Sequence, residues 1–412
     1  MAGRDVDYLL VGGGLASGNC ARWLRQSGAD GSIVIVGREL DLPYDRPPLS
    51  KGYLQGKESK QDALFRPADW YAEQRIEALT RTSAMKLDLA ARTVKLSNKE
   101  ELSFGQLLLA TGANVRRLQA PGAELEGIHY LRTFGNSDAI RSDAAGKRVV
   151  MIGGSYIGCE VAASLCTLGS SCSILMMEPV TLSRHFGTSA GRFFQRRLEE
   201  HGVEIYGDDE LERFEGADGR VTKVLTKAGR ELDADVVVIG VGVTPDVMLA
   251  RSAGLELGQT GGIRVDSHLQ TAVPGVYAAG DVAEYESVVN GGRSVLVEHW
   301  DVAFSHAKTV ALNMLGKGEP HQAVPYFFSD LADWASLEYV GLAHEWDREV
   351  IRGSLDEGKF TVFYLQQDAV QAALSVGRSE DLAHARSWIA AGKQFGAGAE
   401  ALADLSTDLE TL

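Results

Sequence analysis

Two glycine-rich strings in the sequence have the residue types needed to hold a phosphate group. GGGLASG (residues 12–18) and GGSYIG (residues 153–158) each follow a short apolar run. Gly12 would permit a tight turn, and Gly14 would let the backbone approach a pyrophosphate, which the positive end of the following helix attracts. The two strings therefore predict two dinucleotide-binding sites in one chain.

An acidic residue follows each string where a ribose contact is expected. Glu39 and Glu178 come after the second apolar run of each motif, where a carboxylate can accept hydrogen bonds from ribose hydroxyls. Glu178 favours NAD over NADP because it would repel a 2′-phosphate, whereas Arg184 close by would attract one. Ser155 takes the place of the middle glycine, so its side chain would lie near the pyrophosphate.

The elements that must position these residues are parallel strands alternating with helices. Apolar runs predict strands at 6–11, 32–36, 107–109, 148–152, 172–177, 235–239 and 275–278, and helical patterns occupy 20–24 and 160–168. Several of these strands run into glycine, which lets the backbone approach a ligand at the carboxyl edge of a parallel sheet. We predict an α/β fold with two Rossmann-like dinucleotide-binding domains, one inserted in the other.

The order of the motifs predicts three domains. The first is discontinuous and comprises residues 1–115 and 245–322, the second comprises residues 116–244, and the third comprises residues 323–412. In the third, strand patterns at 335–342, 349–353, 359–365 and 369–377 precede a helical pattern at 381–391, which indicates a small α+β interface domain. We expect the acidic tail after Gly398 to be a frayed helix or disordered.

Composition narrows the class of protein. The 412 residues include 41 lysines and arginines against 56 aspartates and glutamates, a formal net charge of −15, which argues against nucleic acid as the main partner. No apolar run has the length of a membrane span. Four cysteines without a C-x-x-C pair argue against a disulfide scaffold, a dithiol motif and a zinc ribbon. We expect a cytoplasmic protein that binds neither nucleic acid nor membranes.

Six further strings make the chain resemble a known family. They are LPYDRPPLSK (42–51), ATG (110–112), GVGVTP (240–245), YAAGD (277–281), EHW (298–300) and PYFFSD (325–330). Together with the two glycine strings they resemble the two-dinucleotide-binding flavoprotein reductases, which have a glutathione-reductase-like fold. Within these, the chain is similar to the FAD-dependent ferredoxin reductases of oxygenase and P450 systems and to the apoptosis-inducing-factor-like oxidoreductases.

The resemblance implies a residue set for each cofactor. For FAD the matching residues are Gly12, Gly14, Ser17, Glu39, Arg46, Lys51, Ala110, Thr111, Gly112, Gly280, Asp281, Trp300 and Phe328. For the nicotinamide nucleotide they are Gly153, Ser155, Tyr156, Ile157, Gly158, Glu178, Arg184 and Gly242. The residues implied for the chemistry itself are Lys51, Glu160 and Glu298. Phe328 stands where the family often has tryptophan, so an aromatic ring is kept and an indole N–H is lost.

Some of these residues have a structural alternative. Asp281 could cap a helix after Gly280, and Glu160 could be a first-turn acid that interacts with the helix dipole. No cysteine occurs from 21 to 158, which disfavours the dithiol and cysteine-peroxidase mechanisms of related proteins. Cys20 and Cys159 each follow a glycine string at the start of a helix, a position that lowers a thiol pKa, although packing is the expected role of the cysteines.

The leading hypothesis is an NADH-dependent enzyme that takes hydride to FAD and passes single electrons to a [2Fe-2S] ferredoxin serving an oxygenase. The alternative is an NADH-responsive redox sensor, similar to apoptosis-inducing factor, that forms a flavin–NAD charge-transfer complex. A quinone or monodehydroascorbate-type reductase is a third reading. Such ferredoxins are acidic, so a local basic patch would be needed, for which Arg22, Arg25 and Arg46 are candidates. The chain could be a monomer or a homodimer.

Overall fold

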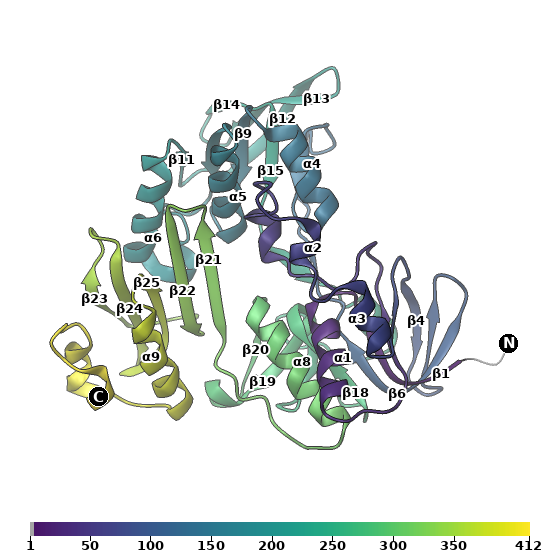
Figure 1. The fold of residues 1–412 in the computed structure, drawn as a ribbon. Helices are drawn as coiled ribbons and strands as arrows, with labels where there is room; N and C mark the ends of the chain where they lie inside the picture. The colour runs from purple at the N-terminus through teal and green to yellow at the C-terminus, as the bar shows by residue number, and fades with distance from the viewer. Residues whose placement is uncertain (1–3) are drawn as a thin grey trace. The chain divides into compact units, whose positions relative to one another are not determined.

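A computed structural model describes residues 4–412 (Figure 1). The chain forms two compact units, each discontinuous in sequence. Unit 1 comprises residues 1–45, 61–114 and 244–325, and unit 2 comprises residues 46–60, 115–243 and 326–412. Two of the boundaries between unit 1 and unit 2 along the sequence fall inside strands, namely β7 (Ala113–Val115) and β16 (Val243–Pro245). The division into three domains stays a prediction.

The main sheet of unit 1 has the strand order β3-β2-β1-β6-β5-β4, with β18 also paired to β6. Its parallel strands are β1 (Arg4–Val11), β2 (Ile33–Val36), β3 (Ile76–Leu79), β6 (Glu101–Leu109) and β18 (Val276–Ala278). The antiparallel strands β4 (Ala84–Asp88) and β5 (Thr93–Leu96) extend it beyond β6. All four residues of β2 are buried, as expected for a parallel strand covered on both faces.

Two helices of unit 1, α1 and α8, pack against each other. α1 (Leu15–Gln26) begins directly after the first glycine string, and α8 (Trp300–Met314) begins at the EHW string. The remaining elements of unit 1 are α3 (Ala68–Glu73), α7 (Met248–Ser252), β17 (Ile263–Val265), η2 (Gly280–Val282), β19 (Ala283–Ser287), η3 (Val288–Asn290) and β20 (Arg293–Leu296), and α2 (Lys60–Ala63) begins at the last residue of a unit 2 segment. The helix expected after Asp281 is wrong, because the chain makes one turn of 3-10 helix there and then enters β19.

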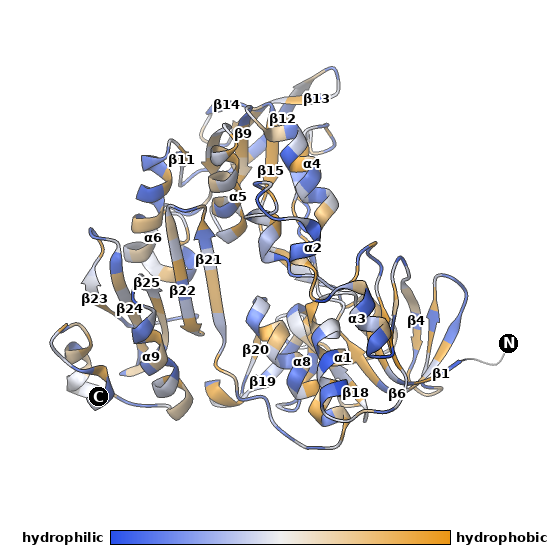
Figure 2. Cartoon of the chain, viewed as in Figure 1, coloured by the Kyte–Doolittle hydropathy of each residue, from blue (hydrophilic) through white to orange (hydrophobic). Residues whose placement is uncertain are grey.

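Unit 2 contains the second nucleotide sheet, whose strands are all parallel in the order β11-β10-β9-β15-β8. These are β8 (Ile128–Tyr130), β9 (Arg148–Ile152), β10 (Ser171–Leu175), β11 (Glu204–Tyr206) and β15 (Val236–Ile239). The helices are η1 (Pro47–Ser50), α4 (Phe134–Ala144), α5 (Tyr156–Thr167) and α6 (Ser183–Glu200). Strands in both nucleotide sheets are coloured hydrophobic in Figure 2, which agrees with their burial.

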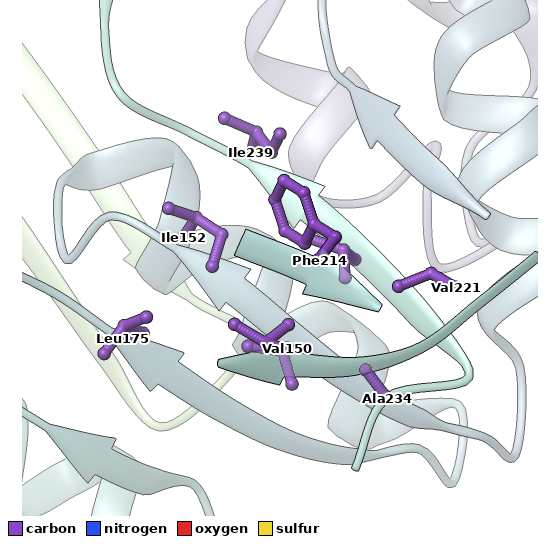
Figure 3. Close-up of a cluster of buried hydrophobic side chains, with 9 residues drawn as sticks. Val150, Ile152, Leu175, Phe214, Val221, Ala234 and Ile239 are labelled. Carbon is purple, nitrogen blue, oxygen red and sulfur yellow. The ribbon is translucent and has the colours of Figure 1, made fainter. Parts of the chain in front are cut away.

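A small antiparallel sheet covers one face of this second parallel sheet. It consists of β12 (Leu211–Ala217), β13 (Arg220–Thr226) and β14 (Glu231–Asp233). Phe214 and Val221 from this sheet pack with Val150, Ile152 and Ile239 from β9 and β15 in one buried cluster (Figure 3). The cluster fixes β9, the strand that leads into the second glycine string.

The C-terminal part of unit 2 is a five-stranded antiparallel sheet in the order β21-β22-β25-β24-β23. Its elements are β21 (Tyr326–Leu331), β22 (Ala335–Gly341), β23 (Arg348–Ser354), β24 (Lys359–Gln366), β25 (Ala369–Val376) and the helix α9 (Ser379–Ala391), which packs on β25 and β22. The four strands and the helix expected here are confirmed, and β21 is an additional strand. The predicted α/β fold with two Rossmann-like sheets and an α+β C-terminal part is thus confirmed.

The acidic tail is ordered, so the expectation of a frayed or disordered end is wrong. It forms η4 (Gly396–Leu402) and η5 (Leu409–Thr411), and Leu402 and Leu409 are buried. Arg352 of β23 holds it by donating to the carbonyl oxygens of Leu402 at 3.3 Å, Asp404 at 2.5 Å and Thr407 at 3.0 Å. Acidic composition alone did not reveal this because the stabilising partner lies about fifty residues earlier.

Within residues 4–412, no helix combines the length and the apolar character that a membrane-spanning segment requires.

Candidate functional site

The first glycine string joins β1 to α1 in unit 1. Its glycines have different surroundings. Gly12 has φ +131°, and a Cβ there would lie 1.9 Å from the carbonyl oxygen of Ala110. A Cβ on Gly14 would meet nothing within 4 Å, so this side of the loop is open. α1 starts at Leu15 with no acidic residue in its first turn. Its positive end is therefore available to an anion approaching the open side of Gly14.

Three strand ends bring the other predicted FAD residues of unit 1 to the same edge of the sheet. Val11 and Leu109 are register partners, and so are Leu109 and Ala278. Three connections therefore leave the sheet at the same edge: the loop at Gly12, the turn 110–112 and the turn 279–281. Gly112 and Gly280 have φ of +69° and +73°, which favours glycine at both turns.

Asp281 lies on this edge, inside η2, and is not the N-cap residue of that helix. The residue that precedes η2 is Ala279, and no side-chain cap is formed there. The capping alternative for Asp281 is therefore wrong. Thr111 is anchored because its hydroxyl donates to the carbonyl oxygen of Asp246 at 2.6 Å.

Two further predicted FAD residues of unit 1, Glu39 and Trp300, are hydrogen-bonded to residues of the LPYDRPPLSK string. Tyr44 donates its hydroxyl hydrogen to Glu39 Oε2 at 2.6 Å. Trp300, the first residue of α8, donates its indole N–H to Asp45 Oδ1 at 2.7 Å. Burial raises the pKa of Asp45, and the indole donor opposes this rise. Glu298 is exposed in the segment between β20 and α8, away from regular structure.

The second glycine string repeats the geometry of the first one in unit 2. Gly153 has φ +109°, and a Cβ there would lie 2.5 Å from the carbonyl oxygen of Gly240, which follows β15. A Cβ on Gly158 would lie 2.0 Å from the carbonyl oxygen of Gly153, so the close approach of α5 to the loop requires glycine. In both units, the first glycine of the string packs against the backbone at the end of the neighbouring strand.

Ser155 fits this loop without a rearrangement. It is the residue before α5, and its hydroxyl donates to the carbonyl oxygen of Gly240 at 3.0 Å. The serine side chain thus cross-links the loop to the end of β15. Gly242 further along has φ +92° and open space on its Cβ side, as Gly14 has in unit 1.

The predicted nicotinamide-side residues lie on the loop, on α5 and after β10. Ile157 exposes 38 % of its surface at the first turn of α5. Tyr156 contacts the rings of His185 at 4.8 Å and Phe327 at 4.5 Å. His185 was not predicted as a site residue. Burial lowers its pKa, Arg184 also lowers it, and Glu178 raises it, so both specificity candidates act on this one side chain. The choice between Glu178 and Arg184 stays a prediction.

Lys51, Glu160 and Phe328 come from three separate segments of unit 2 and meet in one cluster. Glu160 is 3 % exposed, and its Oε1 lies 2.7 Å from the Nζ atom of Lys51. Ser50 donates to Glu160 Oε2 at 2.5 Å, and Ser329 donates to Oε1 at 2.6 Å. The ammonium group of Lys51 lies 5.7 Å from the centre of the Phe328 ring. Glu160 is therefore the buried counter-ion of Lys51 rather than a first-turn acid acting on the helix dipole.

Sequence reasoning missed Ser50 and Ser329, although both lie in strings that were singled out. Each adjoins a predicted site residue, and a serine next to a buried carboxylate is a suitable donor. Arg46, in the same string as Ser50, donates to the carbonyl oxygen of Arg132. Its guanidinium is thus engaged in unit 2.

Cys20 and Cys159 lie near a helix N-terminus but are buried. Cys20 and Cys159 are both fully buried, and burial raises the pKa of each thiol. Desolvation of the thiolate thus outweighs the effect of the helix dipole, which agrees with the packing role expected of these cysteines.

The residues present suit a flavin dinucleotide in unit 1 and a nicotinamide dinucleotide in unit 2. Each string combines a glycine forced by a close backbone contact with an open backbone position at a helix start. In addition, Ser17 of α1 has a buried hydroxyl without a hydrogen-bond partner among the described residues. FAD, when bound, accepts a hydride from a nicotinamide nucleotide and can release electrons one at a time. The protein binds and orients the two nucleotides, and its Glu160 side chain fixes the ammonium group of Lys51.

Fold and loops together define an oxidoreductase with two dinucleotide-binding sites. Residues 6–307 match the family model described as pyridine nucleotide-disulphide oxidoreductase, and residues 326–412 match the one described as reductase C-terminal. The chain belongs to the pyridine nucleotide-disulphide oxidoreductase family, and membership implies binding of FAD and of NAD(P)H.

Curated relatives match along almost the whole chain. The anthranilate 1,2-dioxygenase system ferredoxin--NAD(+) reductase component of Burkholderia cepacia is 36 % identical over 98 % of both chains. Putidaredoxin reductase CamA of Pseudomonas putida is 36 % identical over 90 % of this chain and 89 % of its own. Human apoptosis-inducing factor 3 is 32 % identical over 94 % of this chain, which spans only 64 % of that protein.

Two solved structures have the same fold over the whole length. The ferredoxin reductase for the CYP199A2 system from Rhodopseudomonas palustris has a TM-score of 0.93 at 34 % identity, covering 98 % of this chain and 99 % of that one. The reductase in the covalent putidaredoxin reductase–putidaredoxin complex has a TM-score of 0.92 at 34 % identity, covering 98 % and 97 %. The predicted resemblance to ferredoxin reductases of oxygenase and P450 systems is confirmed.

Proposed function

We propose that this protein is a cytoplasmic, NADH-dependent FAD enzyme that passes single electrons to a [2Fe-2S] ferredoxin serving an oxygenase. The observation that carries the proposal is the full-length similarity to the ferredoxin--NAD(+) reductase component of a dioxygenase system, 36 % identical over 98 % of both chains. The two glycine loops supply a site for each dinucleotide, and no cysteine from 21 to 158 is available for a dithiol step.

In this proposal the buried cluster around Glu160 holds the Lys51 side chain in place for the reaction. The family resemblance implies that Lys51 takes part in the chemistry, and an ammonium group can stabilise negative charge that develops in a reaction. Glu160 fixes the side chain of Lys51, and the hydroxyls of Ser50 and Ser329 fix Glu160 in turn. Phe328 supplies an aromatic face next to Lys51 in the same unit.

A basic and aromatic cluster on unit 1 supports an acidic partner for this acidic chain. Arg22 lies over the rings of Trp23 and Phe304, at 5.2 Å and 5.4 Å from their centres. Arg66 lies 4.6 Å from the Phe65 ring, and the exposed Lys308 lies 4.8 Å from the Trp23 ring. We name this set the unit 1 basic cluster; its members are Arg22, Trp23, Phe65, Arg66, Phe304 and Lys308.

Of the three arginines proposed from sequence, only Arg22 belongs to this cluster. Arg25 instead donates to the carbonyl oxygens of Ala29 and Gly31 at 2.7 Å each, and also to those of Gln74 and Arg75. It is therefore occupied in holding loops of the fold. Arg22, Arg66 and Lys308 present positive charge beside apolar rings, a combination suited to docking an acidic protein.

The test is rapid mixing of NADH-reduced enzyme with acidic [2Fe-2S] ferredoxins at several salt concentrations. We expect fast transfer that slows as salt rises, and further slowing in the Arg66→Glu and Lys308→Glu variants. Lys317→Glu makes the same charge change outside the cluster and should have a much smaller effect. Absence of fast, salt-sensitive transfer would refute the proposal. Slow turnover with a lasting long-wavelength absorbance would instead support an NADH-responsive sensor.

A further inference from the structure

Two histidines lie side by side in the interior of unit 1 and have no part in the scheme above. His306 on α8 is 0 % exposed, and His321, which follows α8, is 3 % exposed. Their rings meet edge-on with centres 4.5 Å apart and an angle of 89°. The ring of Tyr285 from β19 also meets His306 edge-on at 4.5 Å. Burying two imidazoles is costly unless their polar atoms are used.

One polar atom of this pair holds the backbone of the Gly280–Asp281 turn. The backbone N–H of Gly280 donates to Nδ1 of His306 at 3.3 Å. Nδ1 must therefore carry a lone pair, which places the ring proton on Nε2. Nε2 has no hydrogen-bond partner among the described residues. The ring is thus neutral, and its one hydrogen bond is made to this turn.

The turn is enclosed by the two helices that pack beside it. A Cβ on Gly280 would lie 3.4 Å from the Cβ of Ala303 on α8 and 3.6 Å from the Cβ of Ala16 on α1. These are ordinary packing contacts, which do not determine the orientation of a peptide plane. The hydrogen bond to His306 does determine it, because it aims the Gly280 N–H at α8. This hydrogen bond fixes the Ala279–Gly280 peptide, which immediately precedes the peptide that joins Gly280 to Asp281.

We propose that His306 is a positioning residue for FAD: its neutral ring holds the Gly280–Asp281 turn in the binding geometry, which makes retention of FAD dependent on pH. The inference rests on the proposed function and on the FAD-binding role that the family resemblance implies for Asp281. A protonated imidazole has a hydrogen on both ring nitrogens and cannot accept from Gly280. Acid would therefore release the turn and with it the cofactor.

The surroundings of His306 set the direction of this pH dependence. Burial, with a smaller contribution from His321, lowers the pKa of His306 well below its ordinary value. The neutral form therefore persists at neutral pH and is lost on acidification. The titratable residues on the elements packed around it are Cys20, Arg22 and Arg25 on α1, Tyr277 on β18, Asp281 on η2, Glu284, Tyr285 and Glu286 on β19, His299, Asp301 and Lys308 on or beside α8, and His321.

Two substitutions of similar size separate the acceptor from the bulk of the ring. His306→Asn removes the ring and keeps an acceptor oxygen near the place of Nδ1, whereas His306→Leu removes both. The matched control His321→Leu deletes the neighbouring buried ring without touching the turn. FAD affinity of each full-length protein is measured by flavin fluorescence during titration of the apoprotein. We expect His306→Leu to bind FAD about tenfold more weakly than His306→Asn, because one backbone donor is left unpaired. His321→Leu should bind FAD as wild type does.

The wild-type protein supplies a second readout that needs no variant. Its retention of FAD in ultrafiltration should fall only when the pH is well below the ordinary histidine pKa of about 6.5, because burial keeps the His306 ring neutral until then. In His306→Asn this fall should be much shallower. Equal FAD affinity of the His306→Leu and His306→Asn variants, or an unchanged acid profile in His306→Asn, would overturn the inference. The Asp281→Ala variant separates a failure of this inference from a failure of the proposed FAD site. If Asp281→Ala binds FAD as fully as wild type does, the proposed FAD site itself is refuted.

Discussion

Replacing Glu160 with glutamine should destabilise unit 2 more than any comparable change to a surface carboxylate. Glu160 is 3 % exposed and receives Lys51 Nζ at 2.7 Å and the hydroxyls of Ser50 and Ser329 at 2.5 Å and 2.6 Å. Glutamine retains one acceptor oxygen, but its NH₂ group replaces the other oxygen and then faces the group that donated a hydrogen bond to that oxygen. The ammonium group of Lys51 then loses its counter-ion while its side chain is only 15 % exposed.

The magnitude follows from the burial of both partners. Removing one member of a buried ion pair costs about 3–5 kcal/mol, because the other charge is left uncompensated. Since Lys51 retains some contact with solvent, we expect the lower end, about 3 kcal/mol, for Glu160→Gln. Lys51→Met in the same protein removes the stranded charge and should recover part of this loss. The double variant would thus be more stable than the sum of the two single changes indicates.

The assay is urea unfolding followed by circular dichroism, with Glu231→Gln as the control. Glu231 forms an ion pair of similar length, 2.8 Å, with Lys223 in the same unit, but its side chain is 60 % exposed. Solvent screening should make that change nearly neutral. An equal shift of the urea midpoint in Glu160→Gln and Glu231→Gln would refute the reasoning, as would strict additivity in the double variant.

Three further predictions concern specificity, pH and the C-terminal tail. Glu178→Ala should lower the ratio of kcat/KM for NADH over NADPH by about tenfold, measured by steady-state kinetics, since a 2′-phosphate no longer meets a carboxylate. Burial lowers the pKa of His321 to about 4, so the unfolded chain takes up its proton first on acidification. The free energy of unfolding should therefore be highest above the ordinary histidine pKa of about 6.5 and should fall by about 2 kcal/mol by pH of about 5. Urea titrations at each pH measure this free energy, and an unchanged value across that range would contradict the prediction. Arg352→Met should free the tail, giving new proteolytic cuts within 396–412 and a loss of about 2 kcal/mol; an uncut tail would show that Arg352 is not what holds it.

Much of the fold was predictable because it depends on local patterns. The two glycine strings sit between an apolar run and a helical pattern, and such a string can form only a few backbone geometries. Hence β1 and α1, and likewise β9 and α5, lie where the sequence indicated. The sheet β12–β14 was not predicted, because its strands are half polar and form a stable layer only by covering β9 and β15.

The candidate site was predictable residue by residue but not as an arrangement. Lys51, Glu160 and Phe328 were each nominated from a different string. That one carboxylate receives Lys51, Ser50 and Ser329 could not be deduced, because Glu160 is separated from each of them by more than one hundred positions in sequence. The same holds for His306, whose importance rests on one contact with Gly280.

The amino-acid sequence by itself determined the two nucleotide-binding loops and the family, since these depend on residue type and short spacing. Tertiary structure alone decided which polar groups are buried together: the counter-ion of Lys51, the acceptor for Gly280 and the arginine that holds the tail. The physical reason is that a hydrogen bond or ion pair gains its strength from exclusion of water, and water is excluded only when distant segments pack against each other.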